Sequence, residues 1–223
     1  PLSKNPVSRL GHEFHDRPGR DFFERAARVL QMHPDSLAHR AYVYGFLCHF
    51  ALDTLSHDYV AEKEAASGLS HARIESELER ALRLRDGLDP ASHRPTGHLV
   101  PSEENAAVIA DFFPEVTQEQ VLDSLRGMVF YLDLLVAPSA LKRWVIFTAL
   151  RLAGQFEKLG GLVVGPDPEP RCEDSNAELL RRFDQAAELA ARLIGDFDRV
   201  VESGQAEDPI YGRTFDPKPE QEA

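Results

Sequence analysis

The chain has 223 residues, a mass of 25.0 kDa and a formal net charge of -12. Its hydrophobic share of 43% and charged share of 28% are those of a globular protein, which excludes disorder, collagen and coiled coil for the whole chain. No apolar run reaches the ~18 residues of a membrane span, so we expect no transmembrane segment. The acidic balance argues against double-stranded nucleic acid as a partner, because such binding relies on many Lys and Arg contacts to phosphate.

Cysteine content bears on location. The two cysteines, Cys48 and Cys172, are too few for a disulfide framework, and we expect a cytoplasmic location on this ground. The sequence starts at Pro1 and not at Met, so the absence of a signal-peptide pattern does not bear on this expectation. The oligomeric state stays open.

Helix signals are frequent from the start of the chain, and strand signals are poor. Apolar residues at helical spacing predict a helix over residues 21–32. Asp35 or Ser36 can cap the next helix, which we expect to run to about Val60. The run of alternating β-branched residues that marks a strand is not found.

In the middle of the chain, one more helix is expected before a long loop. Ser70 can cap a helix over residues 71–86, and Gly87 can end it. Residues 88–101 contain three prolines and are expected to form the loop.

Two capping boxes predict where later helices begin. In a capping box, the side chain of a Ser or Thr accepts from the backbone N–H of a Glu or Gln three residues later, whose side chain accepts from the backbone N–H of the Ser or Thr. The boxes are Thr117 with Gln120 and Ser175 with Glu178. We expect the first of these helices to reach about Val136, and the second to reach about Ser203 before Gly204 ends it. Between them, a helix over 141–159 and an irregular segment over 160–172 are expected. In sum, the sequence predicts an all-α fold, with a single compact multi-helix domain over residues 1–204 and a polar, extended C-terminal tail over 205–223.

The helix around Ala41–Tyr59 carries ionisable residues among apolar neighbours. His49, Asp53 and His57 follow one another at i, i+4 and i+8, so their side chains project from one face. A helix that is apolar nearly all round is expected to be buried, and buried ionisable groups require partners. Zinc would serve all three, because imidazole and carboxylate are zinc ligands. The alternative is a metal-free ladder of hydrogen bonds between the same three side chains.

The next predicted helix opens with a second His and carboxylate pair at i, i+4, namely His71 and Glu75. Side chains on a first turn lean toward the preceding loop. Residues 61–70 are long enough to fold this helix back on the previous one, which would unite His57, His71 and Glu75 in a His₂Glu site with a position for water. The alternatives are a carboxylate favoured by the helix dipole and an exposed loop-edge histidine.

A further histidine ligand can come from upstream, where the spacing in Gly11–His15 leaves His12 and His15 equally plausible.

Three segments together resemble the zinc-dependent phospholipase C family, in particular its uncharacterised bacterial branch. They are Tyr44–Asp53, Ser56–Val60 and Ser70–Glu75, where the branch reads His-Tyr-x-Leu-Asp, His-Pro-Tyr-Val and His-x-x-Ile-Glu. Arg9–His15 with the following Phe22-Phe23, and Cys172–Phe183, resemble further parts of that family. Asp58 stands where the family usually has Pro, and no residue matches the ligands that the family supplies upstream of its Gly-x-x-x-His motif.

The resemblance implies an all-helical fold related to that of the phospholipases C and single-strand nucleases, with one to three zinc ions. The implied ligands are His57, His71 and Glu75 for one zinc, and His15, His49 and Asp53 for a second, with Asp53 able to bridge to a third. The implied activity is hydrolysis of a small-molecule or lipid phosphate ester by zinc-activated water, without a covalent intermediate.

Other functions stay open at this point. The single-strand nucleases of the same superfamily hold a similar zinc cluster, which makes a nucleotide phosphodiester another candidate substrate. An HD-type phosphohydrolase would account for the dipeptide His57-Asp58, but it would leave His49, Asp53 and the later His–Glu pair unexplained. A protein of another class, a non-catalytic helical protein, would use zinc only to join two helices or would hold none.

Overall fold

The computed structural model describes residues 6–216, apart from the side chains of residues 157 and 158. Its described residues form helices joined by loops and contain no strand, only one isolated bridge between Pro18 and Thr214. The expected all-α class is confirmed. Within this range, no helix combines the length and apolar character that a membrane crossing requires.

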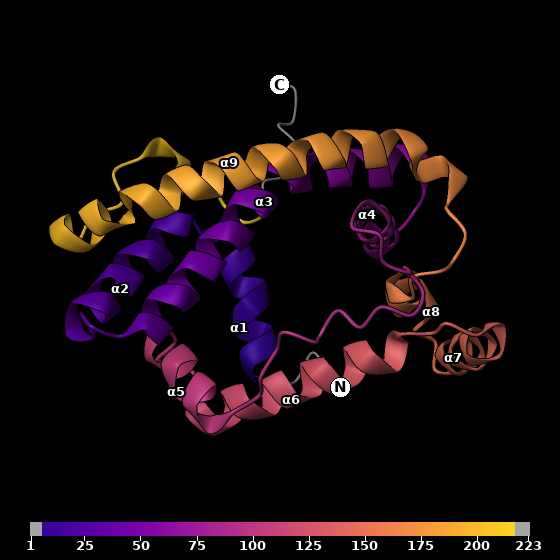
Figure 1. Ribbon diagram of the computed structural model, residues 1–223, viewed down its shortest axis with the longest axis horizontal. Helices are drawn as coiled ribbons and strands as arrows, with labels where there is room; N and C mark the ends of the chain where they lie inside the picture. Colours follow the sequence, from indigo (N-terminus) through magenta and orange to yellow (C-terminus); the bar gives the residue numbers. More distant parts are fainter. Residues whose placement is uncertain (1–5, 217–223) are drawn as a thin grey trace. The chain divides into compact units, whose positions relative to one another are not determined.

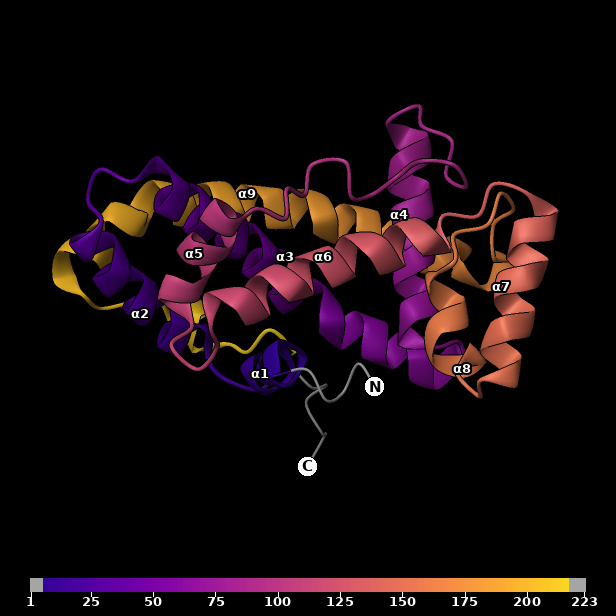
Figure 2. The same cartoon turned by 90° about the horizontal axis from the view of Figure 1, so that it is seen from below.

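The helices follow one another along the chain as Figures 1 and 2 show. Their bounds are α1 Pro6–His15, α2 Gly19–Met32, α3 Leu37–Ser67, α4 His71–Arg85, α5 Glu103–Phe112, α6 Gln118–Leu135, α7 Ala140–Leu152, α8 Phe156–Leu159 and α9 Glu173–Ser203, with short 3-10 turns η2 Gly160–Leu162, η3 Pro170–Cys172 and η4 Pro209–Gly212. Contacts between residues divide the described chain into two compact units, each made of separate stretches. The first unit comprises residues 6–58, 100–127 and 183–216, and the second comprises residues 59–99 and 128–182.

The first unit is organised around aromatic residues of α2. Phe22 and Phe23 are fully buried, and the Phe23 ring lies 5.2 Å from that of Phe50 in α3 and 6.0 Å from that of Phe197 in α9. Phe22 stacks on Phe46 of α3 with 3.8 Å between ring centroids. Figures 1 and 2 show α2 beside the N-terminal half of α3 and the C-terminal half of α9. This packing fixes the rotation of α3 about its own axis, and so decides which way its polar stripe faces.

The residues after α9 complete the same core. Ala206, Tyr211 and Phe215 are buried there, and the Gly19 N–H donates to the Arg213 carbonyl over 2.8 Å. The expected extended tail is therefore wrong for residues 205–216, because well-spaced apolar residues in a polar segment are enough to fold it onto the core. The rest of that predicted tail, 217–223, lies outside the described residues.

The second unit has a smaller apolar core and a buried charge cluster. The core contains Val60, Leu69, Ile74, Cys172 and Leu179. Burial of the Cys172 thiol raises its pKa.

Glu77 of α4 lies beside this core with only 1% of its surface exposed. Its carboxylate accepts from Arg80 at 3.0 Å and from the Glu169 N–H at 3.1 Å, and it lies 3.2 Å from the Arg73 guanidinium. Three donors thus compensate one buried charge.

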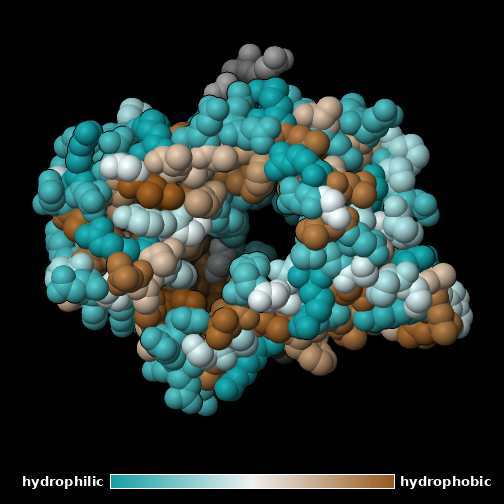
Figure 3. Space-filling view, in the orientation of Figure 1, coloured by the Kyte–Doolittle hydropathy of each residue, from teal (hydrophilic) through white to brown (hydrophobic). Residues whose placement is uncertain are grey.

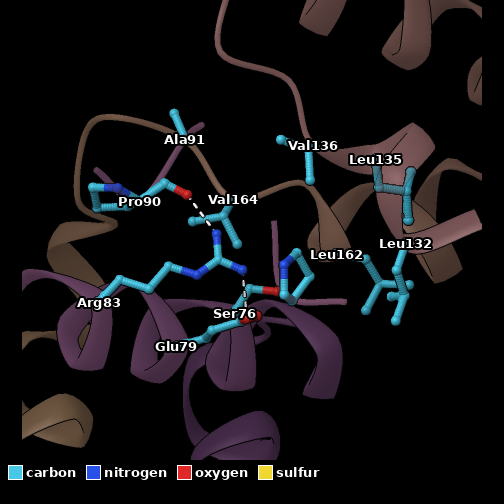
Figure 4. A pocket seen from close by; sticks show the side chains of 11 residues that line it. Ser76, Glu79, Arg83, Pro90, Ala91, Leu132, Leu135, Val136, Leu162 and Val164 are labelled. Carbon is cyan, nitrogen blue, oxygen red and sulfur yellow. Dashed lines mark hydrogen bonds and ion pairs between the residues drawn. The ribbon is translucent and has the colours of Figure 1, made fainter. Parts of the chain in front are cut away.

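A pocket of about 70 Å³ also lies in the second unit. Figure 4 shows Arg83 of α4 across it, donating to the Pro90 carbonyl at 2.5 Å and paired with Glu79. Leu132 and Leu135 of α6 supply part of its apolar wall. This volume is well below the ~300–1,000 Å³ of usual ligand pockets.

Helix α7 exposes much of its apolar surface. None of its residues is buried, and Leu141, Trp144, Val145 and Leu152 are each more than half exposed. Figure 3 shows brown, hydrophobic surface in the region of this helix.

Several predicted helix ends are confirmed by their hydrogen bonds or backbone angles. The capping box before α6 forms in full, because Gln120 Oε1 accepts from the Thr117 N–H at 2.9 Å and Thr117 Oγ1 accepts from the Gln120 N–H at 3.2 Å. Gly87 and Gly204 end α4 and α9 with φ of 73° and 71°, a conformation that favours glycine.

Other predicted boundaries are wrong. Helix α3 continues past Val60 to Ser67, because the run Ala61–Ala66 is made of good helix formers. The helix expected over 141–159 is broken at Gly154, where φ is +63°. Ser175 does not cap α9, which already begins at Glu173; its hydroxyl instead donates to the carbonyl of Cys172, the last residue of η3. Helices α1 and α5 were not predicted.

Candidate metal centre

The predicted stripe of α3 is present, and all its members lie in the first unit. His49 Nε2 lies 3.2 Å from Asp53 Oδ2, and His57 Nε2 lies 3.8 Å from Asp53 Oδ1. Spacing of four residues therefore places one carboxylate between two imidazoles, as expected for one face of a helix.

Helix α1 brings a third imidazole to the same carboxylate. His15, at the end of α1, places Nε2 3.9 Å from Asp53 Oδ2. Leu10 and Phe14 are buried on that helix, and the Phe14 ring packs against Phe22 and Phe113, which fixes the position of α1. His12, the other histidine left open by the sequence, is exposed on α1 and lies outside the His15–His49–Asp53 group.

Two of these rings are held in place through their second nitrogen. His15 Nδ1 lies 2.7 Å from the Gly11 carbonyl oxygen, and His57 Nδ1 lies 2.8 Å from the Phe215 carbonyl oxygen. A carbonyl oxygen only accepts, so each Nδ1 is the donor. In the neutral ring the lone pair is then on Nε2, which faces Asp53. This arrangement is the one that orients histidine ligands in metal sites.

The cluster is only partly buried, and the expectation that α3 is buried on every side is wrong. The side chain of Asp53 is 9% exposed, whereas those of His15 and His49 are 40% and 48% exposed. The carboxylate thus lies at the base of the group and the imidazoles reach solvent. An open side of this kind gives a small molecule access to the donors.

The donor set fits a zinc ion. Two imidazole nitrogens and one carboxylate oxygen from His15, His49 and Asp53 lie within 4.8 Å of one another. Bonds of ~2.0–2.1 Å in tetrahedral geometry would place ligand atoms ~3.3 Å apart. The distances of 3.2 and 3.9 Å to Asp53 Oδ2 are close to that spacing. A small rotation of the His15 side chain would bring the second value into agreement.

The other predicted ligand set joins His57 of the first unit to His71 and Glu75 of the second, and it stays a prediction. Within the second unit, His71 Nε2 lies 3.1 Å from Glu75 Oε1, as their spacing on the first turn of α4 predicts. The His71 N–H donates to Glu64 Oε1 at 3.1 Å. This contact gives the N-terminal end of α4 a capping partner from α3.

Sequence reasoning missed the groups that orient the histidines. The Gly11 and Phe215 carbonyls hold two of the rings, and Asp216 Oδ1 lies 3.8 Å from His57 Nδ1. Main-chain carbonyls have no residue-type signature, and Phe215 is 158 residues from His57. Only the helical i, i+4 step from Gly11 to His15 was available as a signal.

Comparison of the chain with protein-family models, with curated proteins and with solved structures finds no match. Assignment of a function therefore depends on the residues and geometry described above.

Proposed function

We propose that this protein is a zinc-dependent hydrolase of phosphate esters, similar to phospholipase C, in which His15, His49 and Asp53 hold a zinc ion. One observation carries the proposal: the His15 and His57 rings are tied through Nδ1 to main-chain carbonyls, and their Nε2 atoms face the buried Asp53 carboxylate. The motif resemblance to the zinc-dependent phospholipase C family supports the same conclusion.

The distances favour a cation at this cluster over a hydrogen-bonded ladder. Direct hydrogen bonds between imidazole and carboxylate would be ~2.7–3.2 Å long. The separation of 3.2 Å for His49 lies at the upper end of this range, whereas those of 3.9 Å for His15 and 3.8 Å for His57 are longer. For His15 and His57, the neutral Nε2 and the carboxylate oxygen are both acceptors, so they repel each other unless a positive charge lies between them. A divalent ion supplies that charge.

The remaining features suit catalysis by solvent water. Bound zinc lowers the pKa of a coordinated water and offsets negative charge on phosphoryl oxygens. Asp53, nearly buried, would hold its charge in an environment that strengthens electrostatic attraction. The exposed faces of His15 and His49 would leave room for the ester. No Ser or Cys nucleophile is required, and one to three ions are compatible with the predicted ligands.

Activity and metal content measured on one set of variants test this proposal. The wild-type protein should contain zinc and hydrolyse a chromogenic phosphate ester. Three esters serve as probes: a generic phosphodiester, the monoester para-nitrophenyl phosphate and the choline ester para-nitrophenyl phosphorylcholine. Asp53→Asn keeps the size of the side chain and removes its charge, so it should abolish turnover. Asp123→Asn, which neutralises an exposed carboxylate on α6, is the matched control and should retain activity.

Measurement of zinc content shows which of the two histidines of α1 is a ligand. His15→Asn should lower the zinc content, whereas His12→Asn on the same helix should leave it unchanged. Protein that holds zinc at full stoichiometry and hydrolyses none of the three esters would favour the non-catalytic zinc protein. Absence of zinc from protein purified without chelator would refute the proposal.

A further inference from the structure

A second group of two histidines and one carboxylate lies elsewhere in the first unit. His39 Nε2 lies 3.0 Å from Asp111 Oδ2, and His33 Nε2 lies 3.7 Å from the same oxygen. The two rings are stacked, with 4.2 Å between centroids and an angle of 7° between planes. Both Nε2 atoms thus lie near one carboxylate oxygen, and rotation of the more exposed His33 ring out of the stack would let both lone pairs converge on one ion. The sequence did not predict this group, because its members come from three separate elements.

Each member is positioned by backbone structure. His33 follows the last residue of α2, where its N–H donates to the Val29 and Leu30 carbonyls. Its own carbonyl accepts from the Ser36 N–H at 3.1 Å, which closes the turn between α2 and α3. Asp111 lies in the last turn of α5. The turn and the helix end therefore hold the imidazoles and the carboxylate in place.

His39 is oriented from its far side as a metal ligand would be. Its side chain is 8% exposed, and its ring lies 5.7 Å from that of buried Phe112. Its Nδ1 lies 2.7 Å from Ser36 Oγ, the hydroxyl that also caps α3 by accepting from the His39 N–H at 3.4 Å. With Nδ1 as donor to this hydroxyl, Nε2 presents a lone pair toward Asp111. A second hydrogen bond that fixes the ring in this way is typical of histidine ligands.

We propose that His33, His39 and Asp111 form a second metal centre, which binds a divalent transition-metal ion of the zinc class. Two imidazoles and one carboxylate suit Zn²⁺, Co²⁺ or Ni²⁺, whereas Ca²⁺ and Mg²⁺ prefer oxygen ligands throughout. The distances of 3.0 and 3.7 Å bracket the ~3.3 Å expected between ligands of a tetrahedral zinc. The side chains of His33 and Asp111 are 41% and 47% exposed, so water can complete the coordination.

This centre would join the turn between α2 and α3 to the end of α5. His39 and Asp111 are 72 residues apart in the sequence. It uses none of the residues assigned to phosphate-ester hydrolysis. Its existence is therefore independent of the proposed function. Without a metal, the same residues would form a hydrogen bond between His39 and Asp111 with the His33 ring stacked beside it.

The test is a count of zinc ions in a protein that lacks the other cluster of the first unit. In the background His15→Asn with His49→Asn, zinc per chain is measured by elemental analysis and native mass spectrometry. Addition of His33→Asn, or separately of Asp111→Asn, should remove one zinc ion per chain. His98→Asn, which changes an exposed histidine outside these groups, should remove none. Both test variants alter partly exposed side chains and leave the buried His39 in place.

Imidazole ¹⁵N resonances provide a readout that a purely structural contact would not change. Titration of metal-free background protein with Zn²⁺ should shift the Nε2 resonances of His33 and His39 and leave that of His98 in place. An unchanged zinc count in both test variants, or Nε2 resonances that do not respond to Zn²⁺, would overturn the proposal. If the wild-type protein and the background variant contain equal zinc, the cluster of His15, His49 and Asp53 binds none. The loss of zinc caused by His33→Asn is then still measured against the background variant.

Discussion

Among single residues, Glu77 illustrates how a charge is accommodated inside a small core. Its carboxylate is 1% exposed and is compensated by Arg80, Arg73 and the Glu169 N–H. Truncation would leave the Arg80 guanidinium, itself 8% exposed, without its main counter-charge. Breaking a buried pair from one side costs far more than a surface pair contributes.

We therefore expect Glu77→Ala to lower the free energy of unfolding by ~3–5 kcal/mol. Urea denaturation, followed by circular dichroism, measures the loss. Glu188→Ala, on the exposed face of α9, is the matched control and should change stability by less than ~0.5 kcal/mol. An equal loss of unfolding free energy in the two variants would show that the buried charge cluster contributes no more to stability than an exposed carboxylate does.

Gly161 marks a close approach of two backbones. A Cβ atom there would lie 2.8 Å from the Arg73 nitrogen and 3.1 Å from the Ala72 carbonyl carbon. Those atoms belong to the first turn of α4, which carries His71 and Glu75. Because backbone cannot move aside as a flexible side chain can, the added methyl would displace that turn.

Gly161→Ala should therefore destabilise the protein by ~1–3 kcal/mol, as overpacking does elsewhere. It should also shift the amide resonances of the first turn of α4. At Gly165 a Cβ would meet only the Asp167 carbonyl oxygen at 3.9 Å, so Gly165→Ala serves as the control. Identical spectra for wild-type and Gly161→Ala would contradict the predicted clash.

At the scale of elements, a partly exposed charge cluster near the start of α9 gives a pH prediction. Glu178 bonds Arg181 at i, i+3 and Arg182 at i, i+4. These bonds lower the pKa of Glu178 from 4.5 to about 2. A carboxyl whose pKa is lowered by folding stabilises the folded state above its unfolded pKa, and this contribution is lost as pH falls toward the folded value.

Carboxyl ¹³C resonances should show Glu178 titrating near pH 2. In Arg181→Ala with Arg182→Ala the midpoint should rise toward 4.5. Added salt should weaken the effect, because both partners are near solvent. A midpoint near 4.5 in the wild-type protein would show that the pairs do not persist in solution.

The elements also show which structural features were predictable from sequence. The capping box of Thr117 and Gln120 was predicted correctly, because it depends only on two side chains three residues apart. The second box failed at Ser175, because η3 runs directly into α9 and moves the helix start to Glu173. The predicted helix is broken at Gly154, although the apolar spacing continues beyond this residue. Hydrophobic periodicity does not indicate whether a glycine adopts a positive φ. Such boundaries depend on packing that no short window of sequence contains.

At the scale of the whole molecule, the site was predictable only where it is local. His49, Asp53 and His57 lie on one helix, so their common face follows from spacing alone. Spacing alone left His12 and His15 open, and the family resemblance indicated His15, which the packing of α1 places next to Asp53. The group of His33, His39 and Asp111 required a turn and a distant helix end to meet, which spacing could not reveal.

Metal binding should stabilise the folded protein as a whole. An ion that binds only the folded state adds to the free energy of unfolding, and ~1 kcal/mol corresponds to roughly 2–4 °C in melting temperature at this size. We expect a strong chelator to lower the melting temperature by several degrees, measured by calorimetry. A variant with Asp53→Asn and Asp111→Asn, which weakens both clusters of the first unit, should respond less. A chelator response equal to that of wild type in this variant would place the stabilising metal elsewhere.

The core of the first unit draws on both early and late parts of the chain, and this has a consequence for synthesis. Tyr211 and Phe215 pack in the same core as Phe22 and Phe23 but are translated about 190 residues after them. Translation adds ~5–20 residues per second, so the last part of this core is made about 10–40 seconds after α2. During that interval we expect the nascent chain to expose apolar surface of the kind that chaperones bind, because the complete core requires residue 215.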